Sequence, residues 1–161
     1  MNVEQTPVTG KEQKAQLSPQ MRALSEFYQA LNDRDMELMA RNWAQTDEVA
    51  MDNPVGGMKR GWHEIQAVYA KVFSSPDPFW FEFHDYTYHE ADEVFYVVGR
   101  ERGEYRSHGG VLEMAIRTSR VFRRIEGEWR QVHHHGSIDD PALLEKYQHA
   151  VGSAGSAKAI Q

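Results

Sequence analysis

The chain has 161 residues, of which 40% are hydrophobic and 26% are charged, and this balance is typical of one globular domain rather than a fibrous or disordered protein. Its 18 basic and 24 acidic side chains give a net charge of −6, which argues against non-specific nucleic-acid binding because phosphate contacts need clustered Lys and Arg. The sequence contains no cysteine, which excludes disulfides, thiolate metal sites and a cysteine nucleophile.

The two ends of the chain are poor in side chains that a core could bury. Residues 1–16 are polar and lack the apolar stretch of a secretory signal, and residues 152–161 are rich in Gly, Ser and Ala. Neither end offsets the entropy of ordering its backbone, so we expect a disordered segment at 1–16, one domain at 17–151 and a flexible tail at 152–161. No apolar run approaches the roughly 20 residues of a membrane helix, and we expect a cytoplasmic protein without membrane or nucleic-acid partners.

Helical patterns dominate the first half of the chain. Ser18-Pro19 suits a helix start, and the apolar residues of 21–31 recur at three- and four-residue spacing. A second helix is predicted over 36–43, after the Asp35 cap. A short strand over 48–52 then leads through a Pro/Gly loop to a third helix over 62–73.

The second half changes to strand patterns and closes with a helix. The β-rich runs are 79–83, 94–100, 111–123 and 129–138, with hairpin turns at 91–93 and 126–128. The Gly109-Gly110 pair starts the third run or places a bulge in it. Asp140-Pro141 caps a last helix. Helices followed by an antiparallel meander predict an α+β fold.

Three groups of residues carry a resemblance to a known superfamily. They are Phe27-Tyr28-x-x-Leu31-Asn32-x-x-Asp35, Asn53-Pro54-x-Gly56-Gly57-x-x-x-Gly61-Trp62-x-x-Ile65, and Arg117-Thr118-x-x-Val121-Phe122-x-x-x-x-Gly127-x-Trp129-Arg130-x-Val132-His133-x-His135-x-Ser137. With them, Ser18 to Ile138 resembles the nuclear-transport-factor-2-like (NTF2-like) superfamily, above all its SnoaL-like and ketosteroid-isomerase-like domains, and is also similar to its kinase-association branch. The resemblance implies a cone-shaped, curved antiparallel (cystatin-like) sheet wrapped against three helices, with a pocket in the concavity and a homodimer formed through the sheet. The superfamily spans isomerases, dehydratases, cyclases, hydrolases and adaptors, so the fold does not name a function.

The strongest local feature is the triplet 133–135. Alternation along a strand puts His133, His135 and Ser137 on one face and His134 on the other, and the family pattern turns the first set toward the pocket. Three interpretations stay open. The histidines could act as general acid and base, could bind a metal together with a third ligand, or could serve as structural hydrogen-bonding groups.

Asp52 is the second candidate, at the end of a short strand where the resemblance places the pocket rim. Proton transfer next to a carbonyl needs a carboxylate in a dry pocket as base and a hydrogen-bond donor for the enolate oxygen. Asp52 could be that base and Tyr28 or Tyr69 that donor. The alternative is that an Asp before Asn-Pro forms a turn or caps a helix.

Arg117 and Arg120 interrupt a β-rich run. Being three residues apart, they face opposite sides of a regular strand, so at most one enters the cavity, where it would bind a carboxylate, phosphate or enolate. The alternative is an exposed arginine paired with Glu101 or Glu104 across strands. A one-residue bulge near 109–110 would exchange the two arginines, so the inward one is left open.

Aromatic side chains are numerous in the helices and in the first long strand. We expect Trp43, Trp62 and Tyr69 to contribute to a ligand pocket, although an aromatic stripe at helical spacing is more often core. The run 79–81 is apolar on both strand faces, which favours a partner sheet and therefore a homodimer.

Two functions from different classes are compatible with these residues. The first is a cofactor-free isomerase, dehydratase or cyclase that transfers a proton on a small carbonyl compound. The alternative is a non-catalytic ligand-binding or oligomerisation domain, similar to the kinase-association domain. The sequence has no phosphate-binding loop and no nucleophile elbow, and no metal or other cofactor is expected.

Overall fold

The computed structural model of the chain describes the backbone of residues 1–157 and the side chains of residues 1–152. The helices are η1 (Lys14–Gln16), α1 (Pro19–Asp33), α2 (Met36–Asn42), α3 (Gly61–Ser74) and α4 (Pro141–Ala157). The strands are β1 (Ala50–Asp52), β2 (Met58–Arg60), β3 (Phe79–Ala91), β4 (Val94–Ser107), β5 (Gly110–Ile125) and β6 (Glu128–Ser137). None of the helices within residues 1–157 is long and apolar enough to cross a membrane.

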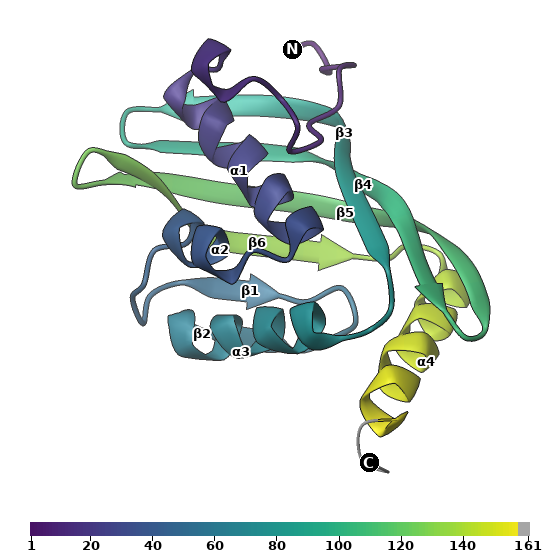
Figure 1. The fold of residues 1–161 in the computed structure, drawn as a ribbon. Coiled ribbons are helices and arrows are strands. Elements are labelled where there is room, and N and C mark those ends of the chain that lie inside the picture. The colour runs from purple at the N-terminus through teal and green to yellow at the C-terminus, as the bar shows by residue number, and fades with distance from the viewer. Residues whose placement is uncertain (158–161) are drawn as a thin grey trace.

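The strands form one strongly curved sheet with α1, α2 and α3 on its concave side (Figure 1). Within the described residues it has six strands in the order β2-β1-β6-β5-β4-β3, antiparallel except for the parallel pair β1 and β6. A Cβ at Gly103 would clash with the Trp80 carbonyl, so glycine lets β3 and β4 approach closely at this pair. The α+β cone expected from the sequence is confirmed.

The predicted helix starts and hairpins are also confirmed. Ser18, Asp35 and Asp140 each accept a hydrogen bond from a backbone N–H in the first turn of the helix that follows. The β4–β5 pairing is continuous from Ser107–Gly110 to Val94–Arg123, so the Gly109-Gly110 pair starts β5 and makes no bulge. The strand β2 and the full lengths of β3 and β4 were not predicted.

The N-terminal segment differs from the disorder expected of residues 1–16. Val8 and Phe83 exchange two backbone hydrogen bonds of 2.9 Å, and the Glu4 N–H donates to the Tyr86 carbonyl at 2.8 Å. The Val8 side chain is only 4% exposed. The segment therefore covers the free edge of β3 with its backbone, an interaction that leaves little trace in side-chain composition. At the other end, residues 152–157 continue α4, and the remainder of the expected flexible tail, 158–161, lies outside the described residues.

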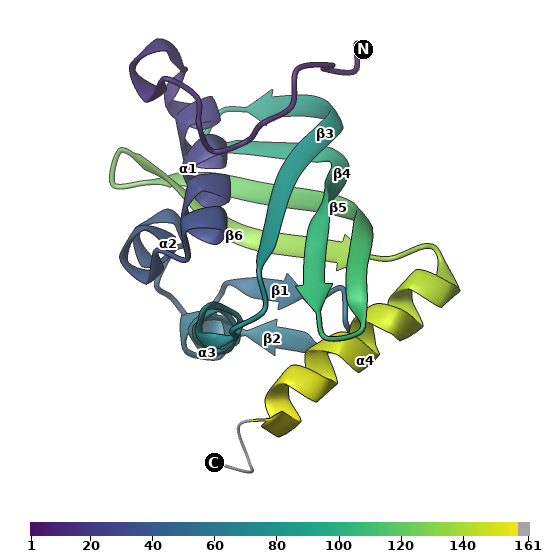
Figure 2. The same cartoon turned by 45° about the vertical axis from the view of Figure 1, so that its right-hand side comes forward.

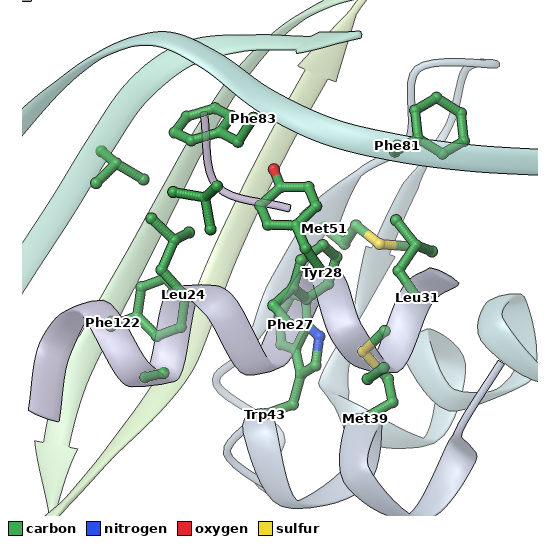
Figure 3. Close-up of a cluster of buried hydrophobic side chains, with 14 of the residues drawn as sticks. Leu24, Phe27, Tyr28, Leu31, Met39, Trp43, Met51, Phe81, Phe83 and Phe122 are labelled. Atoms are coloured by element: carbon green, nitrogen blue, oxygen red, sulfur yellow. The ribbon is translucent and has the colours of Figure 1, made fainter. Parts of the chain in front are cut away.

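The core fills the space between α1 and the sheet (Figure 3). Leu24, Phe27 and Leu31 project from α1, and the Tyr28 ring stacks on Phe83 with centroids 5.8 Å apart. Trp43 and Tyr69 are buried in the same cluster, and Trp62 packs against it from the side. Trp43 and Tyr69, expected to line a pocket, are thus core residues, and Trp62 is partly buried against them.

Candidate functional site at β1, β6 and α4

A bulge in β6 decides which histidines face the helices. Val121 pairs with His133 and Phe122 with Gln131, so Val132 has no partner on β5. The extra residue turns His134 inward, where it is 5% exposed, and turns His133, His135 and Ser137 to the convex face. The prediction that His133, His135 and Ser137 share a face is therefore right, and the prediction that this face is the concave one is wrong.

Arg120 is the arginine that faces inward, and it is held by a buried polar network. Its guanidinium is 1% exposed and donates to Glu101 Oε1 at 2.5 Å, to Gln131 Oε1 at 2.7 Å and to the Tyr28 hydroxyl at 3.3 Å. The Tyr28 hydroxyl donates to the same Glu101 oxygen at 2.9 Å. The guanidinium also lies 3.5 Å from the centre of the Phe27 ring. The predicted pairing with Glu101 thus exists, but inside the core instead of on the surface.

Burial and the neighbouring charges fix the protonation states of the groups in this network. Burial raises the pKa of Tyr28 well above its usual range, and the charge of Glu101 adds to the effect, so the hydroxyl stays protonated. Burial alone would lower the pKa of Arg120, but the neighbouring Tyr28 and Glu101 oxygens outweigh it and raise the pKa. Burial likewise raises the pKa of Tyr69 to about 12. Tyr28 and Tyr69 were expected as donors to an enolate oxygen, but both side chains are buried in the core and the Tyr28 hydroxyl already donates to Glu101.

On the convex side, the structure brings together two of the predicted catalytic residues. The parallel pairing of β1 with β6 sets Asp52 beside His135, and Asp52 Oδ2 lies 2.9 Å from His135 Nδ1. The two side chains are 29% and 51% exposed. His135 Nε2 makes no hydrogen bond within the part of the chain that the structure describes.

A groove of about 430 Å³ opens beside this pair. Asp52, His135 and Ser137 line it together with the Asn53–Met58 loop, and Leu144 and Gln148 of α4 form the opposite wall. The Gln148 side chain donates to the Val55 carbonyl at 3.0 Å, which ties α4 to the loop. Most of the lining is apolar, which suits an organic molecule with a small polar part.

The arrangement at the groove is that of an imidazole oriented by a carboxylate. A neutral His135 that donates from Nδ1 to Asp52 has its lone pair on Nε2, where it can accept a proton. Among residues 1–152, no group of three His, Asp or Glu side chains is placed to hold a metal ion, so the metal interpretation of the histidines has no support.

The other predicted site residues do not join the groove. The Nδ1 atom of His133 lies 3.1 Å from the Ala50 carbonyl. Arg117 is exposed on the convex face, opposite Arg100 and Ser137. Gln131 and Glu101, which complete the Arg120 network, were not predicted as inward polar residues. The signal for Glu101 was the alternation of residues along β4 and β5, which gives the face of each strand once their turn is fixed. Gln131 lies on β6, opposite the buried Phe122.

Comparisons with known proteins bear on the family of the chain. Residues 21–141 match the model of the SnoaL-like domain family. The chain is 27% identical over 143 residues to the F-box protein SKIP8 of Arabidopsis thaliana, a match that covers 86% of this chain and spans 59% of the length of that protein.

Solved structures share the fold. A candidate dehydratase of the NTF2-like family from Streptomyces avermitilis matches with a TM-score of 0.65 and 20% identity, over 71% of this chain and 90% of that one. A candidate calcium/calmodulin-dependent protein kinase type II association domain from Thiobacillus denitrificans matches with a TM-score of 0.63 and 22% identity, over 74% and 94%. At such identities these matches show an NTF2-like fold and not an activity.

Proposed function

Since the chain belongs to the SnoaL-like domain family, we propose that it binds a small carbonyl compound in the groove beside β1 and α4 and transfers a proton on it. The observation that carries the proposal is the 2.9 Å contact between Asp52 and His135. Parallel pairing of strands 83 residues apart puts a carboxylate on one imidazole nitrogen and leaves the other free.

In the proposed reaction, His135 is the general base and Asp52 orients it. His135 Nε2 removes a proton from the carbon next to the carbonyl, and the electron pair of that C–H bond forms an enolate. The Ser137 hydroxyl, which also lines the groove, donates a hydrogen bond to the enolate oxygen. The imidazolium then returns the proton to carbon, so an isomerisation needs no further reactant.

Proton exchange tests this proposal without knowledge of the natural substrate. The full chain is incubated in D2O with a panel of small ketones and enones, and loss of the α-proton signal is followed by NMR. We expect His135→Gln to lower the exchange rate on a responsive compound by about 10²–10⁴, because a positioned general base contributes that much. Asp52→Asn is expected to lower it too, by leaving the imidazole unoriented.

The matched control is His89→Gln, which removes a histidine of the convex face that stacks on Tyr96, away from the groove. Exchange at the buffer rate for every compound would overturn the enzyme proposal. So would an equal loss of rate in His89→Gln and His135→Gln.

A second function, assembly through the sheet, is favoured by the convex face itself. Tyr96 and Val98 are 41% and 46% exposed there. On the same face Arg100 stands opposite Arg117 and Glu104 opposite Glu113, like-charge pairs that ion pairs of Arg100 with Asp139 and of Glu104 with Arg106 offset in part. A second copy related by a two-fold axis could place the glutamates of one sheet over the arginines of the other.

Sedimentation velocity measures this assembly. We expect a dimer, and we expect Val98→Glu to shift it to monomer at the same protein concentration while the circular dichroism spectrum stays unchanged. Met58→Glu, which likewise adds one negative charge at an exposed apolar position, here on the edge strand β2, is the matched control. A monomeric wild-type chain would contradict the proposal, and a dimer without proton exchange would favour assembly as the function.

A further inference from the structure

A larger cavity lies at the other side of α4, where the helix passes under the tip of the β4–β5 hairpin (Figure 2). Its volume is about 710 Å³. Val111 and Leu112 of β5 and Ala150 of α4 give it apolar walls, and Asp77, from the loop between α3 and β3, contributes a carboxylate. Glu145 and Lys146 lie at its exposed rim.

Asp77 is a buried carboxylate without a cationic partner. The residue is 8% exposed, and its side chain accepts one hydrogen bond, from the Tyr105 hydroxyl to Oδ2 at 2.8 Å. Across the described residues no Lys, Arg or His nitrogen lies within 4.0 Å of the carboxylate, and Oδ1 accepts no hydrogen bond. Buried carboxylates are ordinarily paired, because removing the charge from water is costly.

The Arg34 side chain binds backbone carbonyls of this loop and not the Asp77 carboxylate. The Arg34 guanidinium donates to the backbone carbonyls of Phe73, Ser75 and Asp77, where it closes the end of α3. Burial raises the pKa of Tyr105 to about 12, and the hydrogen bond to Asp77 and the negative charge of Asp77 add to the effect. The Tyr105 hydroxyl therefore remains a neutral donor, and within the described residues the Asp77 carboxylate beside the cavity has no ion-pair partner within 4.0 Å.

We propose that this cavity binds a small organic cation, a protonated amine with an apolar body, whose N–H groups donate to Asp77. The body of the molecule packs against Leu112, Val111 and Ala150. Lys146 opposes a cation, and His108 and His149, which also line the cavity, do so whenever they are protonated. All three side chains are exposed to water, which screens their effect, whereas Asp77 is buried. The site is separate from the His135 groove and does not depend on the proposed proton transfer.

Benzylamine and benzyl alcohol are suitable probes, because they share their shape and differ in charge at neutral pH. Binding to the full chain is followed by NMR of isotope-labelled protein, through the amide signals of Leu112 and Ala150. We expect benzylamine to bind about tenfold more tightly than benzyl alcohol, since a charge-assisted hydrogen bond is the only difference between them. Asp77→Asn, which keeps an acceptor for Tyr105, is expected to abolish the preference.

Glu145→Gln is the matched control, because it removes a carboxylate of the same cavity at its exposed rim. The preference for benzylamine is expected to survive it. If Asp77→Asn does not fold, Ala150→Trp provides a second variant that leaves Asp77 in place. Its indole would occupy volume that the ligand needs, and it should weaken benzylamine binding at least tenfold. Equal affinity for the two probes, no binding of either at millimolar concentration, or a preference unaffected by Asp77→Asn would each overturn the proposal.

Discussion

Arg120→Met is expected to lower the free energy of unfolding by about 3–5 kcal/mol, the cost typical of breaking a buried ion pair from one side. The substitution leaves Glu101, 4% exposed, with the Tyr28 hydroxyl as its remaining donor, and it leaves Gln131 Oε1 without the guanidinium. Urea denaturation followed by tryptophan fluorescence gives the unfolding free energies.

Arg117→Met is the matched control, three positions along the same strand but on the exposed face. We expect it to change stability by less than about 0.5 kcal/mol, as surface substitutions usually do. A loss in Arg120→Met no greater than in Arg117→Met would contradict a buried, paired Arg120.

The double variant Arg120→Met/Glu101→Leu separates the worth of the pair from the cost of an unpaired charge. We expect it to be more stable than Arg120→Met alone, because no uncompensated carboxylate stays behind. A double variant as unstable as the single one would show that the lost contacts of Arg120, such as the one with the Phe27 ring, matter more than its charge.

The sequence contains enough information to predict that Arg120, and not Arg117, faces the core. The hairpin at 107–110 sets Ser107 opposite Gly110, so each odd-numbered residue of β4 pairs with an even-numbered residue of β5. Phe95 and Glu101 therefore share a face with Phe122 and Arg120. Two apolar residues on that face identify it as the core side.

The orientation of β6 and the contact of Asp52 with His135 could not be predicted in the same way. The bulge at Val132 adds one residue without a glycine or a turn to mark it, and it reverses the face of every residue that follows. β1 reaches β6 through parallel pairing across most of the chain, and no hairpin fixes that register. The helix starts were predictable because a capping side chain acts within its own turn.

The His134 imidazole is expected to make stability depend steeply on pH. Burial lowers its pKa well below 6.5, and the charge of Arg120 lowers it further, although a hydrogen bond with the Ser119 carbonyl opposes the shift. As the pH falls below about 6.5, His134 therefore binds a proton in the unfolded chain but stays neutral in the folded chain. The contribution of neutral His134 to the free energy of unfolding is fully present above pH 6.5. It is lost as the pH falls from there toward the lower pKa of the folded state.

We expect the free energy of unfolding to fall by up to about 1.4 kcal/mol for each pH unit below 6.5, and His134→Asn to flatten this slope. Urea denaturation between neutral pH and pH 5 measures it. Glu12 has a lowered pKa because hydrogen bonds from Ser25 and Thr9 outweigh its burial, so its contribution is lost only below about pH 4.5, outside this window.

The same experiment tests the bulge that sets the whole convex face. Neighbouring strand residues point to opposite sides, so a regular β6 would bury His133 and His135 and expose His134. With Val132 bulged, His134→Asn should flatten the pH profile and His135→Asn, at a half-exposed position, should not. The opposite result would place His135 among the buried residues, and the groove beside Asp52 would lose the base that its proposed chemistry requires.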